Sequence, residues 1–90
     1  DSSVALGGSA LALEIDAVAV GTSSSATGFS ALAVGTRANG SGANSVAVGN
    51  LAQAQVGEST AIGANSSAIG FFTTALGAQS IAIGSNAIAL

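Results

Sequence analysis

The sequence predicts an all-β fold, a parallel β-roll (β-solenoid) of very short strands, and three observations predict it. Ten of the thirteen glycines fall at residue numbers that are multiples of seven. Inside each seven-residue unit, small and branched residues alternate with the period of two that side chains follow along a strand. No insertion interrupts the thirteen units, so we expect a single repeat domain over residues 1–90.

One unit reads small residue, variable residue, alanine, aliphatic residue, glycine and then two variable residues, as in the stretch from Ser45 to Leu51. A coiled coil also repeats every seven residues, but a glycine in each heptad costs a helix about 1 kcal/mol. The charged positions that flank a coiled-coil seam are absent as well. We therefore expect four or five strand residues, then a turn of two or three residues that begins at glycine, where a positive φ is tolerated.

Two units are expected to make one coil, because aliphatic and polar units alternate between Ala17 and Val56. Aliphatic strands are predicted at residues 18–20, 32–34 and 46–48, and polar strands at 25–27, 39–41 and 53–55. Strands one coil apart would pair at about 4.8 Å, so that six and a half coils make a rod of about 30 Å. The small columns never vary in size and are predicted to fill a thin interior between two sheets.

The aliphatic strands would then carry an outward ladder of branched side chains, a large apolar patch that soluble monomers avoid. An alanine interior also supplies little burial to offset chain entropy. Both features predict that several copies pack these faces together around an axis. The predicted interface residues are Val18, Val20, Leu32, Val34, Val46 and Val48.

Near both ends, successive units are all aliphatic, as at Val4 to Leu13 and at Ile81 to Leu90. Either the terminal coils contact neighbouring segments of a longer protein, or the phase of the interface shifts there.

The turn columns place large side chains on one edge of the roll. Ile15, Phe29 and Phe71 follow the polar strands, and we expect them either to pack against a neighbouring subunit or, joined by Phe72, to contact a ligand. The only cation, Arg37, is predicted on the opposite edge from Glu14, Asp16 and Glu58.

Composition argues against several kinds of function. The chain has no His, Lys or Cys to act as base or nucleophile, so we expect no enzyme activity, cofactor or metal site. Glu14 and Asp16 are read as a solvated turn. A net charge of -3 with one cation argues against binding nucleic acid, and no apolar run is long enough for this segment to insert into a membrane.

Four segments, NSVAVG (44–49), STAIG (59–63), TALG (74–77) and QSIAIG (79–84), resemble the head repeats of trimeric autotransporter adhesins of Gram-negative bacteria, the YadA-like heads. The resemblance implies a left-handed roll with fourteen residues per coil, assembled as an intertwined or side-by-side homotrimer. It also implies a bacterial cell-surface protein, anchored in the outer membrane through regions outside this chain. Glu14 and Val56 depart from the glycine position, so the turns there are expected to differ.

Such heads bind extracellular-matrix proteins or cell-surface receptors of a host, and one another, so the resemblance implies an adhesin head. A passive spacer in a surface fibre has the same architecture without a ligand. Ice binding would require a threonine ladder, which the polar strands lack.

Overall fold

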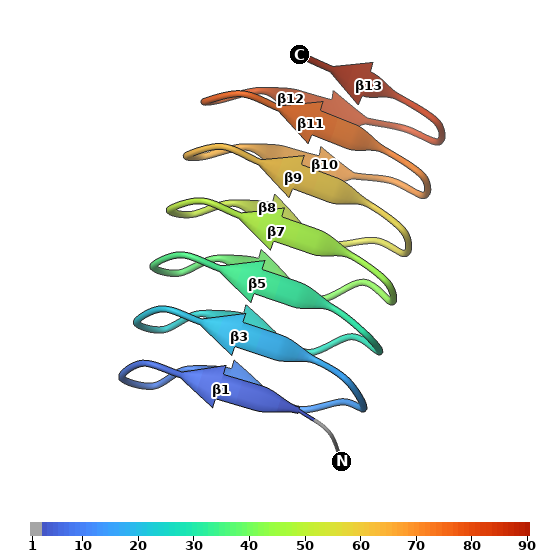
Figure 1. Cartoon of the computed structure of the whole chain (residues 1–90). Coiled ribbons are helices and arrows are strands. Elements are labelled where there is room, and N and C mark those ends of the chain that lie inside the picture. Colours follow the sequence, from blue (N-terminus) through green and yellow to red (C-terminus); the bar gives the residue numbers. More distant parts are fainter. Residues whose placement is uncertain (1–2) are drawn as a thin grey trace.

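The computed structural model describes residues 3–90 as a parallel β-solenoid whose chain winds through two facing sheets (Figure 1). Residues 1 and 2 of the predicted domain lie outside the described residues. Sheet A contains β1 (Val4–Leu6), β3 (Val18–Val20), β5 (Leu32–Val34), β7 (Val46–Val48), β9 (Thr60–Ile62), β11 (Thr74–Leu76) and β13 (Ile88–Ala89). Sheet B contains β2 (Leu11–Ala12), β4 (Ser25–Ala26), β6 (Asn39–Gly40), β8 (Gln53–Ala54), β10 (Ser67–Ile69) and β12 (Ile81–Ile83).

Each strand pairs in parallel with the strand one coil away, at a sequence distance of fourteen residues. Val46 of β7, for example, pairs with Leu32 of β5 on one side and with Thr60 of β9 on the other. The principal extents are 31 × 21 × 11 Å. The predictions of two strands per coil, a rod of about 30 Å and a thin roll are confirmed.

The strands are shorter than predicted: they span two or three residues, whereas four or five were expected. The remaining residues of each unit form a hydrogen-bonded turn. In the turn that starts at Gly49, the N–H of Ala52 donates to the Gly49 carbonyl over 3.1 Å. The small residue at the start of the next unit therefore closes a turn before the next strand begins.

The interior consists of the two small columns, as predicted. Ala19, Ala33 and Ala47 stack in neighbouring strands of sheet A and are completely buried. The largest fully buried side chain is that of Thr73. The space between the sheets therefore holds a methyl or hydroxymethyl group on each side and nothing larger than the side chain of threonine.

Buried hydroxyl groups in this interior donate to the turn carbonyl three residues earlier. Ser66 Oγ donates to the Gly63 carbonyl over 2.9 Å, and Thr73 Oγ1 donates to the Gly70 carbonyl over 2.9 Å. This bond satisfies a hydroxyl group that has no water to bind, so the column accepts Ser and Thr as readily as Ala.

Ser45 departs from this pattern, because its buried Oγ has no hydrogen-bond partner. Its neighbour across the interior is Gly40, the one residue of its column that is not alanine. A Cβ atom added at Gly40 would lie 3.3 Å from Ser45 Oγ. The Ser45 hydroxyl group therefore borders the space that the missing methyl group leaves open.

The second turn residue of every unit adopts a left-handed backbone, which the sequence did not predict because these residues are not glycine. Their φ angles run from 53° at Ser30 to 65° at Leu51 and Asn86. A positive φ at this position, together with the bond that closes the turn, matches a type II turn. From Ser23 onward, each of these residues also donates its N–H to the preceding coil, as Leu51 does to the Thr36 carbonyl over 3.0 Å.

The glycine at the end of a strand is required for two reasons. Gly49 has a φ of 130°, and a Cβ atom there would lie 2.7 Å from the carbonyl carbon and oxygen of Gly63 in the next coil. At Gly42 the φ is not in the left-handed region, and the close approach of the Val56 backbone excludes a side chain.

Glu14 and Val56 stand where most units have glycine, so the backbone of the next coil leaves room for a side chain at these two positions. Neither has a positive φ, and both lie on the same edge as Gly28 and Gly42, which do not either. The turns at Glu14 and Val56 therefore match those at Gly28 and Gly42, with the same closing hydrogen bond of 3.2 Å, and differ only from the turns whose glycine has a positive φ.

The strained turns give a reciprocal test. Gln79→Asn should stabilise the chain by about 0.5–1 kcal/mol, because asparagine tolerates the left-handed backbone at φ 64° better than glutamine does. The matched control is Asn65→Gln on the same edge, where φ is 62° and an equal destabilisation is expected. Urea unfolding measures both changes, and a destabilised Gln79→Asn variant would contradict the assignment.

The interior hydroxyl groups give a second test, at two positions stacked one coil apart. Ser59→Ala removes a bond of 2.6 Å to the Val56 carbonyl and should cost about 1 kcal/mol. Ser45→Ala removes an unpartnered hydroxyl group together with its desolvation cost, so the unfolding free energy should stay unchanged or rise by up to about 1 kcal/mol. If thermal unfolding shows that both variants lose the same amount of stability, the Ser45 hydroxyl group has a hydrogen-bond partner.

Candidate functional site

The outer faces and edges of the roll are its candidate functional surfaces. Residues 3–90 contain no pocket and no group of three or more His, Cys, Asp or Glu residues that would hold a metal ion. No helix in the described part of the chain has the length and apolar character needed to cross a membrane.

The outward face of sheet A carries all six predicted interface residues. They lie on β3, β5 and β7, where each outward side chain is half-buried by the strands above and below and each intervening alanine points inward. The six residues are Val18, Val20, Leu32, Val34, Val46 and Val48. The structure thus brings them together in one apolar patch.

The patch extends along the whole sheet, beyond the residues that the sequence pattern singled out. One column is aliphatic in every paired strand, and it runs Leu6, Val20, Val34, Val48, Ile62 and Leu76. In the second column, Thr60 and Thr74 interrupt the aliphatic residues. Ile62 and Leu76 were missed because their units also contain threonine, which made them look mixed.

The two sheets keep their alternation of strands up to both ends of the roll. Odd-numbered strands remain in sheet A throughout. The extra aliphatic residues instead lie in sheet B, at its two ends, and include Leu11, Leu13, Ile81 and Ile83.

The centre of sheet B is polar on its outward face. Outward side chains of β4, β6 and β8 and the residues just after them are Ser25, Thr27, Asn39, Ser41, Gln53 and Gln55. Within this group, Gln55 Nε2 donates to Gln53 Oε1 over 2.9 Å. Thr27 is the only threonine among them, so the face has no threonine ladder.

The turns from sheet B to sheet A form what we call the aromatic edge, at residues 14–16, 28–30, 42–44, 56–58, 70–72 and 84–86. Ile15 and Phe29 lie in adjacent coils and are about half exposed. Phe71 and Phe72 form a separate pair three coils beyond Phe29, with ring centroids 6.5 Å apart. The sequence placed these four residues on one edge, and the structure divides them into two groups.

The Phe71 ring lies over Gly57 in the coil below. A Cβ atom added at Gly57 would lie 3.2 Å from Phe71 Cε1. Between Phe29 and Phe71 the edge therefore carries only Ala43 and Gly57 in the same turn column, which makes a stretch of small residues between two groups of large ones.

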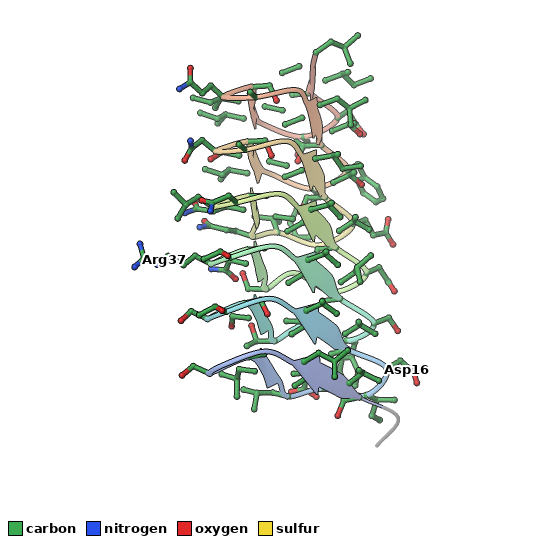
Figure 2. All side chains as sticks on the ribbon, turned by 60° about the vertical axis from the view of Figure 1, so that its left-hand side comes forward. Asp16 and Arg37 are labelled. Carbon is green, nitrogen blue, oxygen red and sulfur yellow. The ribbon has the colours of Figure 1, made fainter. Side chains whose placement is uncertain are left out.

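The opposite turns, from sheet A to sheet B, form the arginine edge at residues 7–9, 21–23, 35–37, 49–51, 63–65 and 77–79. Figure 2 shows Arg37 on this edge and Asp16 on the other side of the roll. Glu14 and Glu58 also belong to the aromatic edge, so the predicted separation of charge is confirmed for the described residues. Leu51 projects from the arginine edge next to Arg37 and was missed, because its left-handed turn position looked simply variable.

Comparison with known proteins supports the same architecture. The sequence matches the family described as YadA head domain repeat (2 copies) over residues 1–24, 26–52, 41–66 and 61–87, which together span nearly the whole chain. Among curated proteins, none matches it. The fourteen-residue coil, the small interior columns and this match agree, and the chain belongs to the family of YadA-like head domains of trimeric autotransporter adhesins.

Proposed function

We propose that the chain is a non-enzymatic adhesin head module that assembles as a homotrimer, with the outward face of sheet A directed to the trimer axis. The observation that carries the proposal is the uninterrupted aliphatic column from Leu6 to Leu76, which a single chain leaves at its surface. Burying it between copies offsets the small contribution of the alanine interior. The number three, the left-handed winding and the side-by-side or intertwined arrangement follow the family.

The proposed setting is the bacterial cell surface, with anchoring in the outer membrane through regions outside this chain. There the trimer would attach to an extracellular-matrix protein or cell-surface receptor of a host, and to other heads. With sheet A inside, the surface left for a ligand is the outward face of sheet B, whose polar centre runs from Ser25 to Gln55. Family membership supports this role.

Charged substitutions on sheet A should dissociate the trimer. Val46→Asp together with Val48→Asp places six carboxylates in an apolar interface, and each would cost several kcal/mol to bury. Analytical ultracentrifugation should then show a monomer. The matched control is Gln53→Asp with Gln55→Asp, which occupies the same positions of the next unit on sheet B and should remain a trimer. If both variants sediment as trimers, sheet A does not face the axis.

The adhesive role predicts binding by the intact trimer. In a solid-phase assay against immobilised matrix glycoproteins and host cells, the 90-residue chain should bind. The Val46→Asp, Val48→Asp monomer should bind at least about 100-fold more weakly because avidity is lost. Gln53→Asp with Gln55→Asp tests whether the polar centre of sheet B contributes. A stable trimer that binds no member of the panel would favour the passive spacer.

A further inference from the structure

The first turn column of the aromatic edge and the second turn column of the arginine edge have opposite profiles of side-chain size over the middle of the roll. Going up the aromatic edge, the first turn column is large at Ile15 and Phe29, small at Ala43 and Gly57, and large again at Phe71. The arginine edge has its two largest turn side chains at Arg37 and Leu51. Its remaining turn positions between residues 8 and 79 are Gly8, Ser9, Thr22, Ser23, Thr36, Asn50, Ala64, Asn65, Ala78 and Gln79.

Sequence number gives the height of a turn along the roll, because residues fourteen apart lie one coil, or about 4.8 Å, apart. Turns of the arginine edge lie seven residues after those of the aromatic edge, which is half a coil. Arg37 is therefore at a height between Phe29 and Ala43, and Leu51 is between Ala43 and Gly57. Leu51 is thus level with the small stretch of the first turn column, and Arg37 is level with the boundary between Phe29 and that stretch.

A cyclic assembly places turns of equal height on the two edges next to each other. If sheet A faces an axis parallel to the roll, the aromatic edge of each chain meets the arginine edge of the next, and rotation leaves every height unchanged. Leu51 of one chain then lies opposite Ala43 of the next, and Ile15 and Phe71 lie opposite turns of small or polar residues. Arg37 of one chain also comes beside the exposed Phe29 ring of the next, an arrangement that favours a cation–π contact.

Charge follows the same division between the edges. The three acidic residues in the described part of the chain lie on the aromatic edge, and its one cation lies on the arginine edge. Figure 2 shows this separation for Asp16 and Arg37. Arg37 is 21 residues after Asp16 and 21 before Glu58, which places it midway between them in height. Its distance along the axis to each is about 7 Å, within the Debye length of about 8 Å at physiological salt.

We propose that these edges form a heterologous joint between copies of the chain, in which Arg37 of one copy lies between Phe29 and Ala43 of the next and Leu51 packs against Ala43, beside the Phe71 ring that covers Gly57. The partner of the aromatic edge is thus a second copy, held by size and charge complementarity, and Phe29 is covered in the assembly. This inference rests on the proposed trimer and specifies how its chains are set against one another.

Engineered cysteines test the joint, because the natural chain contains none. Arg37→Cys with Ala43→Cys places two thiols about 2 Å apart in height on edges that meet. Mild oxidation should convert most chains into a covalent trimer on a non-reducing gel, and reduction should return a single band. The control, Arg37→Cys with Ser85→Cys, separates the thiols by about 16 Å in height and should give no covalent trimer.

Sedimentation under reducing conditions distinguishes failure of the proposed joint from failure of the proposed trimer. Trimers that cross-link in the Arg37→Cys, Ala43→Cys variant and not in the control support the joint. Trimers that fail to cross-link, or that cross-link equally in the control, overturn the joint and leave the proposed trimer intact. A wild-type chain that sediments as a monomer overturns both.

A charge-reversal experiment tests the joint without engineered cysteines. Arg37→Glu should weaken the trimer by roughly five-fold per contact, and adding Glu58→Arg should restore part of the loss. If Arg37→Glu leaves trimer dissociation unchanged, charge does not hold the joint.

Discussion

The small separation between the two sheets is the constraint on which the rest of the structure depends. Fourteen residues per coil leave room for two strands of two or three residues and two tight turns, and the roll is only 11 Å thick in its smallest dimension. Nothing larger than threonine fits inside completely. The chain therefore cannot build a core of leucine or phenylalanine, and its larger apolar side chains must lie outside. An apolar exterior follows from the geometry of the coil, and it is this exterior that the proposed trimer would cover.

The same tight coil stores strain in its turns. Each unit holds a residue that is not glycine in the left-handed region, at a cost on the order of 1 kcal/mol for residues such as Leu51 and Phe72. This conformation points the N–H of the second turn residue at the coil below, where it meets the carbonyl of the first turn residue. Inter-coil hydrogen bonding thus continues around the turns, and the ladder that offsets the strain is nearly unbroken around the roll.

Much of this architecture was predictable from the sequence because each feature repeats many times. The glycine spacing indicated the coil length, and the uniformly small columns indicated the interior. Strand length was predicted wrongly, because a residue such as Ala52 looks like strand by its size but closes a turn by its N–H. The left-handed positions were hidden for a related reason: Arg37, Leu51 and Phe72 are not residue types that signal a positive φ. The contact of Ser45 with Gly40 joins residues on opposite sheets, and no periodicity indicates it.

The surfaces were less predictable than the interior, because their pattern has a period of fourteen and its members vary. Thr60 and Thr74 obscured the aliphatic column that Ile62 and Leu76 continue, and only strand pairing showed that sheet A keeps its phase.

The pattern at the edges is a change of side-chain size along the roll and not a repeat. It therefore acquires a meaning only when the arrangement of neighbouring copies is also considered. Ala43 and Gly57 look unremarkable alone, and Arg37 and Leu51 look like ordinary turn residues. They become complementary only when a rotation axis sets one edge beside the other at equal height. In a repeat protein of this kind the uniform size of the interior columns builds the roll. In the proposed trimer, the turn residues whose size differs from coil to coil set the height at which one copy aligns with the next.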